Sequence, residues 1–83
     1  MRRGAWSEPV TFETQRLGQY RTIISAEEAA GILMGEWPIE DGSALRAACE
    51  ACLDALEGRG DPEVARSAFL RAADEANVFI RDA

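Results

Sequence analysis

The sequence predicts a two-layer α+β domain in which an antiparallel β-hairpin packs against three α-helices, in the order ββααα. A period-two pattern of apolar residues near the N-terminus indicates one strand, and a β-branched run shortly afterwards indicates the second. Three later segments repeat their apolar residues at helical spacing, and glycine or proline separates them. Because 83 residues can enclose only one hydrophobic core, we expect a single domain over residues 1–83.

The hairpin is expected in the first third of the chain. Apolar and polar side chains alternate over residues 9–14, as in a strand with one buried face. Residues 15–19 are polar and include a glycine, which suits a short loop, and residues 20–24 predict the returning strand. We expect residues 1–7 to form a frayed N-terminal segment.

The first helix is expected to begin after Ser25 and to end near Trp37. Ser25 and Glu28 match a capping box, in which each side chain bonds the backbone of the other residue. Pro38 ends the helix because the residue before a proline resists the α conformation. The stripe expected to face the core consists of Ala26, Ala30, Leu33 and Trp37.

Gly31 and Gly35 lie four residues apart in this first helix. In membranes such spacing favours close contact between helices. In a water-soluble helix each glycine costs about 1 kcal/mol relative to alanine. We therefore expect both glycines to be required by local packing within the chain.

The second helix is expected over about Ser43–Glu57, with Asp41 or Ser43 as its N-cap. Gly58 suits the left-handed position that follows a helix. The residues expected to be buried are Leu45, Ala48, Cys49, Cys52, Leu53 and Leu56.

Asp61 and Pro62 predict the start of a third helix, as a capping carboxylate followed by a proline in the first turn. Asn77 can end this helix in the left-handed conformation. The strand-like residues 78–80 could add a short third strand beside the hairpin. The expected buried stripe is Val64, Ala65, Ala68, Phe69, Ala72, Ala73 and Ala76.

The composition excludes several classes of function. Fifteen acidic residues against nine arginines give a net charge of −6, which disfavours nucleic-acid binding. No apolar run approaches the roughly 20 residues that cross a membrane, and the N-terminus lacks the apolar core of a secretion signal. We therefore expect a cytoplasmic protein with reduced thiols. The absence of histidine excludes an imidazole base, and we assign no catalytic residue and no cofactor.

Cys49 and Cys52 lie three residues apart and so share one face of the second helix. Two thiols without histidine fall short of the four ligands that structural zinc requires, although a dimer could supply four thiolates. Redox cysteines are typically activated at a helix N-terminus, whereas these two lie well inside their helix. We expect both thiols to pack in the core, and a thiol or metal switch at this pair remains an alternative.

Arg66, Arg71 and Trp37 are the candidate ligand-binding residues. Arginines beside a buried stripe could hold a carboxylate or phosphate, and a tryptophan could stack on a ligand. Alternatively, each arginine forms an ion pair with a neighbouring acid while Trp37 fills the junction between the first helix and the core. A small-ligand or anion-binding protein is the corresponding functional hypothesis.

Several motifs together resemble a known family. They are Pro9-Val10 in a strand, Ser25 with Glu28-Ala29, Leu33 followed by Trp37-Pro38, Ala48-Cys49, Ala55-Leu56-Glu57-Gly58, and the run from Ala65-Arg66 to Glu75-Ala76. The chain resembles the bacterial family called domain of unknown function 982 from about Trp6 to Val78. Trp37-Pro38 and Ala65-Arg66-x-Ala68-Phe69 are the most specific parts, and Asn77 stands where the family would have glycine. The resemblance implies small stand-alone proteins of rhizobia and related alphaproteobacteria, and it implies no activity.

The leading functional hypothesis is a non-enzymatic protein-interaction module. No group of polar residues converges in the pattern, yet the chain has more apolar surface than so small a scaffold can bury. Such a module could dock to another protein or associate with itself as a homodimer.

Overall fold

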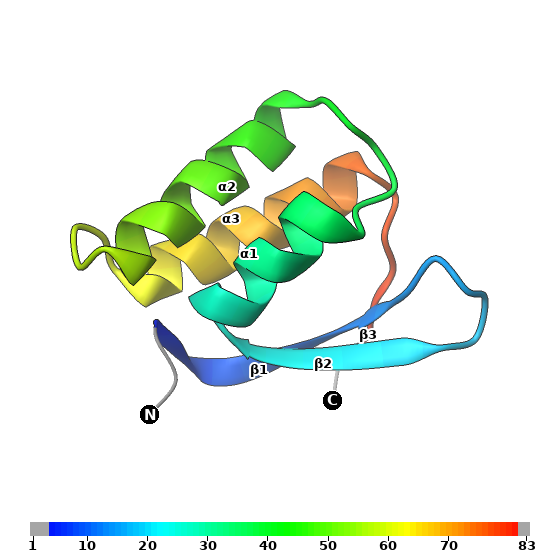
Figure 1. The fold of residues 1–83 in the computed structure, drawn as a ribbon. Helices are drawn as coiled ribbons and strands as arrows, with labels where there is room; N and C mark the ends of the chain where they lie inside the picture. The colour runs from blue at the N-terminus through cyan, green and yellow to red at the C-terminus, as the bar shows by residue number, and fades with distance from the viewer. Residues whose placement is uncertain (1–3, 82–83) are drawn as a thin grey trace.

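The computed structural model describes residues 4–81 of the chain. It has the expected order of two strands, three helices and a short final strand, and is an α+β fold (Figure 1). The elements are β1 (Ala5–Glu13), β2 (Tyr20–Ser25), α1 (Ala26–Gly35), α2 (Ser43–Leu56), α3 (Pro62–Glu75) and β3 (Ile80–Arg81).

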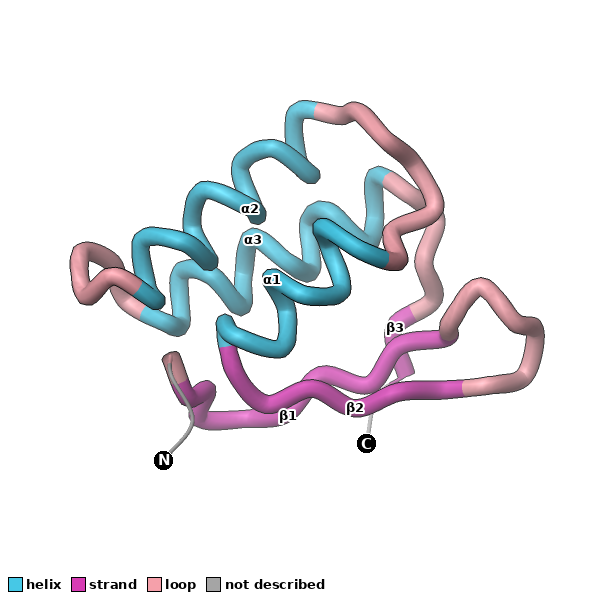
Figure 2. Tube along the Cα trace, viewed as in Figure 1, coloured by secondary structure: helices cyan, strands magenta, loops and turns pink. Residues whose placement is uncertain are grey.

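The three strands form one antiparallel sheet in the order β2-β1-β3. Thr11 of the central strand is paired with Thr22 on one side and with Arg81 on the other. The third strand that the sequence left open is therefore present, at Ile80 and Arg81. Figures 1 and 2 show all three helices on the same side of this sheet. No helix of residues 4–81 covers the opposite side.

The first strand begins earlier than the sequence indicated. It starts at Ala5 rather than Pro9, and its side chain Trp6 is buried in the core. The expectation of a frayed segment over residues 1–7 is therefore wrong for residues 5–7, while residues 1–3 lie outside the described part. Burial of a tryptophan supplies the driving force for ordering this segment. The pairing of β1 with β2 is irregular between Ala5 and Val10, so a strict alternation starts only at Val10.

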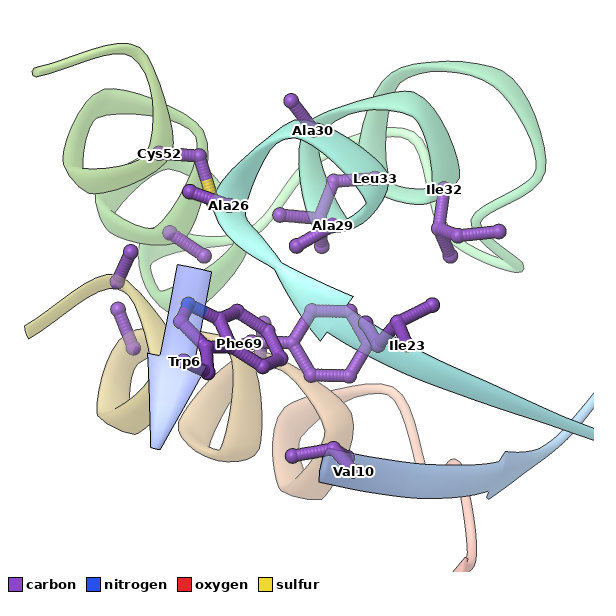
Figure 3. Close-up of a cluster of buried hydrophobic side chains, with 14 of the residues drawn as sticks. Trp6, Val10, Ile23, Ala26, Ala29, Ala30, Ile32, Leu33, Cys52 and Phe69 are labelled. Atoms are coloured by element: carbon purple, nitrogen blue, oxygen red, sulfur yellow. The ribbon is translucent and has the colours of Figure 1, made fainter. Parts of the chain in front are cut away.

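Phe69 of α3 lies at the centre of the core. Its ring centroid is 5.4 Å from that of Trp37, 5.6 Å from Phe12 and 6.1 Å from Trp6. Two segments that are far apart in the sequence, β1 and the residues that follow α1, thus meet on one side chain of α3, as the close-up in Figure 3 shows for Trp6 and Phe69. The other buried residues of α3 are all small, namely Ala65, Ala68, Ala72 and Ala73. These alanines allow the helices to approach closely.

Helix α1 begins where the sequence predicted, with Ser25 as its cap, but the Glu28 carboxylate bonds the Ile24 amide, one residue before the Ser25 amide of the predicted capping box. Ser25 Oγ accepts a hydrogen bond from the Glu28 amide at 3.2 Å, and Glu28 Oε1 accepts one from the Ile24 amide at 2.7 Å. The helix ends at Gly35, two residues before the expected end at Trp37. The following Pro38 is consistent with an early end, because the chain must leave the α conformation before it.

Both ends of α3 also follow the sequence. The Asp61 carboxylate accepts a hydrogen bond from the Glu63 amide at 2.9 Å, and Pro62 occupies the first turn. Asn77 has φ = 57°, the left-handed conformation that was predicted to end this helix.

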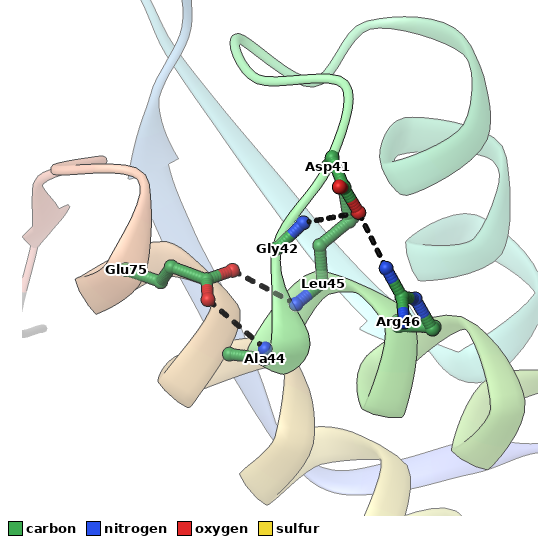
Figure 4. A network of polar contacts seen from close by, with 6 residues as sticks. All are labelled: Asp41, Gly42, Ala44, Leu45, Arg46 and Glu75. Carbon is green, nitrogen blue, oxygen red and sulfur yellow. Dashed lines mark hydrogen bonds and ion pairs between the residues drawn. The ribbon is translucent and has the colours of Figure 1, made fainter.

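The N-terminus of α2 differs from the prediction. Its N-cap is Gly42, and neither Asp41 nor Ser43 provides the capping bond. Instead, the carboxylate of Glu75 at the end of α3 accepts hydrogen bonds from Ala44 N at 3.1 Å and Leu45 N at 3.0 Å (Figure 4). A Cβ on Gly42 would collide with this carboxylate, so a larger residue there would displace the Glu75 cap. The cap therefore joins two helices, and the charge of Glu75 also complements the α2 dipole.

Two residues predicted to be buried are exposed. Leu53 retains 43% of its accessible surface and Val64 retains 59%. Leu53 directly follows the buried Cys52 and Val64 directly precedes the buried Ala65, and one step along a helix rotates a side chain by about 100°. The stripe that is buried on α2 and on α3 is thus narrower than the stripe of apolar residues on the same helix.

Candidate functional site

The helix-free side of the sheet is the main candidate site. Side chains alternate along each strand, so Val10, Phe12 and Ile23 point to the helices and are buried. Their neighbours point the other way and form a surface that we call the open face. It consists of Thr11, Glu13, Tyr20, Thr22, Ile24, Phe79 and Arg81.

An aromatic group occupies one end of the open face. The ring centroids of Tyr20 and Phe79 are 6.4 Å apart in an edge-to-face arrangement, and the Arg81 guanidinium carbon lies 5.1 Å from the Tyr20 centroid. Tyr20 remains 40% exposed and Phe79 56% exposed. Edge-to-face and cation–π contacts of this kind contribute about 0.5–1 kcal/mol each at exposed sites. They join Tyr20 of β2, Arg81 of β3 and Phe79, which directly precedes β3, in one contacting group.

Apart from Glu13, whose carboxylate accepts a hydrogen bond from the Gly18 amide at 2.7 Å, the rest of the open face is uncharged. Thr11 and Thr22 share a hydrogen bond of 2.7 Å between their hydroxyl oxygens in the row next to the aromatic group. Ile24, which is 39% exposed, follows at the other end of β2. The open face therefore runs from an aromatic end, across a hydroxyl row, to an aliphatic end.

Charge is distributed unequally between the two layers. Residues 26–76, which form the helices and their loops, contain twelve acidic residues and four arginines. The described residues of the sheet layer, 4–25 and 77–81, contain two acidic residues and three arginines. The helical layer thus carries the negative charge of the protein, whereas the sheet layer is close to neutral.

The outer edge of β2 is partly closed. Glu28 Oε1 binds the Ile24 amide, which would otherwise be available to another strand. Edge strands that keep their backbone groups free can pair with foreign strands, and a carboxylate bound at the edge opposes this. The open face, rather than the strand edge, is the larger accessible surface of the sheet.

A second candidate site is a cleft of about 570 Å³ beside the hairpin loop. It lies between this loop, the end of α1 and the segment that joins α3 to β3. Phe12, Ile32 and Trp37 supply apolar walls, while two arginines, Arg16 and Arg21, and two glutamates, Glu13 and Glu36, are the charged residues of the lining. Arg21 forms an ion pair with Glu36 at 3.3 Å. The two arginines were not singled out from the sequence, because only the folded hairpin brings them near Trp37.

The structure does not gather Arg66, Arg71 and Trp37 into one site. Trp37 lines the cleft, and neither arginine belongs to its lining. Arg66 Nε donates a hydrogen bond to the carbonyl oxygen of Glu8 at 3.0 Å and so connects α3 to β1. Arg71 is exposed and forms no ion pair with another residue of 4–81. Trp37 packs on Phe69, and its indole nitrogen is buried without a hydrogen-bond partner in the described chain.

The environment of the two cysteines disfavours reactive thiolates. Cys52 is fully buried, and burial together with the nearby Cys49 raises its pKa to about 11. Burial also raises the pKa of Cys49, which is half-buried. Because the thiolate is the nucleophile and the metal ligand, both shifts oppose a thiol or metal switch at neutral pH. Over residues 4–81, no three acidic or cysteine side chains are placed to hold a metal ion.

Most well-placed carboxylates have a structural role. Glu75 and Asp61 cap helices, and Glu63 accepts hydrogen bonds from the amide and hydroxyl of Ser7 at 2.8 and 3.0 Å. Arg46 and the Gly42 amide bind Asp41 and lower its pKa, the hydrogen bond from Arg46 being the main cause. These groups connect elements of the fold and do not face one another across a cavity.

These features define a small two-layer α+β domain whose sheet is open on one side. Residues 8–80 match the model of the family described as protein of unknown function, DUF982, and the chain belongs to this family, as the sequence motifs indicated. Neither the curated proteins nor the solved structures gave a significant match. Among the helices of residues 4–81, none is long and apolar enough to cross a membrane.

Proposed function

We propose that this protein is a non-enzymatic interaction module that binds a protein partner through the open face of its sheet. The observation that carries the proposal is the exposure of Tyr20, Phe79 and Ile24 on the side of the sheet that no described helix covers. Monomeric proteins leave single apolar residues exposed without consequence, but a contiguous patch is typical of a binding site.

The composition of the open face supports this proposal. Tyrosine, phenylalanine and arginine are enriched in protein interfaces, and charged residues are depleted from interface centres. Here Tyr20, Phe79 and Arg81 form one contacting group, and the adjoining Thr11 and Thr22 carry no charge. The group is already ordered in the free protein, so its binding would cost little side-chain entropy.

A cytoplasmic location is part of the same proposal. Two cysteines do not form a disulfide framework of the kind that stabilises small secreted domains, and this composition supports a reducing compartment. The acidic helical layer also makes a protein a more suitable partner than a nucleic acid.

Affinity capture with matched variants tests this function. Tagged wild-type protein should recover a partner, which includes an untagged copy of the chain itself. Thr22→Glu, which places a charge in the middle of the open face, should lose that partner. Ser67→Glu adds the same charge on the exposed surface of α3 and should retain it. Equal recovery by the two variants, or no partner for the wild type, would show the proposal to be wrong.

The cleft supports a second candidate function, the binding of a small anionic ligand. Its volume of about 570 Å³ lies within the range of ligand pockets, and Arg16 and Arg21 stand beside the aromatic wall of Trp37. A panel of small carboxylates and phosphates should then raise the melting temperature of the wild type by mass action. The shift should disappear in Arg16→Gln. A flat response across the panel, or an equal shift in the variant, would exclude this function.

A further inference from the structure

We infer that the partner on the open face is a second copy of this chain, and that the two copies pack sheet against sheet. This inference rests on the proposed function, because it names the occupant of the same surface. The product would have four layers, with the two sheets inside and the two helical layers outside.

The unequal distribution of charge carries the inference. Two copies that meet through their helical layers would bring together surfaces with twelve acidic residues and four arginines each. Two copies that meet through their sheets keep these layers on opposite outer sides, separated by both sheets. Stacked sheets lie about 10 Å apart, and the two acidic helical layers lie outside them. The distance between the acidic layers therefore exceeds the screening length of about 8 Å at physiological salt. Of the two symmetric contacts, helical layer to helical layer and sheet to sheet, the sheet-to-sheet contact has the weaker repulsion.

The order of side chains on the open face is also self-complementary. The aromatic group of Tyr20 and Phe79 lies at one end, Ile24 at the other, and the hydroxyls of Thr11 and Thr22 lie between them. A twofold axis through the threonine row, perpendicular to the strands, places the aromatic end of each copy over the aliphatic end of the other. Thr22 then lies close to the axis in both copies, and so does Arg81, which pairs with Thr11 in the same row.

The size of the open face sets the expected affinity. Six residues of β2 extend over about 20 Å, and three strands at about 4.8 Å spacing are narrower than this. The face is therefore smaller than the roughly 800 Å² per partner of a standard interface. We expect a reversible dimer with a dissociation constant that is micromolar or weaker.

Sedimentation equilibrium with charge-swapped variants tests the inference. The wild type should dimerise as its concentration rises, while Thr22→Glu and Thr22→Arg should each weaken the dimer at least tenfold, because like charges meet near the axis. An equimolar mixture of the two variants should recover the dimer. Ser67→Glu and Ser67→Arg provide the matched control on α3, and both should associate like the wild type. Circular dichroism should show that every variant is folded.

Salt provides a second arm of the experiment. Added salt should strengthen the wild-type dimer, because it screens the repulsion between two acidic proteins and between the two Arg81 side chains of the joined faces. A dimer held by ion pairs would weaken instead, and this would contradict the proposed interface.

Three results would overturn the inference. A wild type that stays monomeric up to about 1 mM would exclude a second copy, since it would place the dissociation constant above the expected range. If Thr22→Glu and Thr22→Arg both dimerise with the dissociation constant of the wild type, the contact lies elsewhere, such as at the β2 edge. A mixture of charged variants that stays monomeric would show that two open faces do not meet. In each case the affinity capture of Thr22→Glu against Ser67→Glu still decides whether the open face binds another protein.

Discussion

The two faces of the sheet differ although the same strands build them. On the inner face, Val10, Phe12 and Ile23 are buried beneath the helices and contribute to one core. On the outer face, Tyr20 and Phe79 are held in place by contacts with each other, yet both remain accessible. The inner face therefore determines stability, and the outer face is available for binding. If this separation is correct, substitutions on the two faces should affect different measurements.

Truncating the centre of the core should have the largest effect. Phe69→Ala removes the ring that packs on Trp6, Phe12 and Trp37, and such a change typically costs about 3–5 kcal/mol. Because a domain of this size has a free energy of unfolding of only about 5–10 kcal/mol, the variant should keep half of its stability or less. Urea unfolding followed by tryptophan fluorescence measures the difference. A loss below 1 kcal/mol would contradict the central place of Phe69.

High pH should destabilise the protein through Cys52. The folded-state pKa of about 11 lies above the unfolded value near 9.0, so the thiol stays protonated in the folded state while the unfolded state ionises. Stability is then fully present below pH 9 and is lost as the pH rises towards 11, by on the order of 2 kcal/mol. Urea unfolding at pH 8 and pH 10.5 should show a smaller loss in Cys52→Ala than in the wild type. Equal losses would mean that this thiol is not the cause.

Removing the cap between helices should have an intermediate effect. Glu75→Ala leaves the amides of Ala44 and Leu45 without their acceptor, and lost N-caps cost about 0.5–2 kcal/mol. Glu75→Gln keeps one acceptor oxygen and should recover part of the loss. Chemical denaturation measures all three proteins. A variant as stable as the wild type would mean that solvent replaces the cap without cost.

Filling an exposed glycine should raise stability slightly. The expectation that local packing requires Gly31 and Gly35 is wrong, because a Cβ at either position would meet no atom of the described chain within 4 Å. Gly31→Ala should therefore gain about 0.5–1 kcal/mol through helix propensity. Thermal unfolding should show a higher midpoint than the wild type. A lower midpoint would reveal a contact that the isolated chain does not make, such as one with a partner.

Substitutions on the outer face should change stability least. Thr22→Glu and Phe79→Ser lie on accessible positions, where most changes stay within about 0.5 kcal/mol. Their effect should appear in association instead. Urea unfolding at low protein concentration, where a weak dimer has dissociated, gives the stability of the monomer alone. A large loss there would mean that the outer face also holds the fold together.

Local signals in the sequence predicted much of the fold. The alternation around Val10, the Ser25 cap, the Asp61-Pro62 start and the left-handed Asn77 all depend on neighbouring residues, and the structure contains each of them. The Glu75 cap could not be predicted in the same way, because Ala44 lies 31 positions away. The N-cap preference for short polar residues predicted Asp41 or Ser43, and neither residue is the cap.

The candidate sites were harder to predict for the same reason. Tyr20 and Phe79 meet only because β3 pairs with β1, which brings the last strand beside the hairpin. Arg16 and Arg21 join Trp37 only when the hairpin loop folds towards α1. Apolar patterns predicted burial for Leu53 and Val64, since the sequence shows which residues are apolar but not how wide a stripe the neighbouring helices cover.

A concentration series of amide nitrogen–proton spectra tests the account most directly. As the wild-type protein is diluted from its dimeric range, chemical shifts should change along β1, β2 and residues 79–81, while amides on the solvent side of α2 and α3 stay constant. Shifts confined to the helices, or no shift at any concentration, would contradict the assignment of the open face as the surface through which this protein associates.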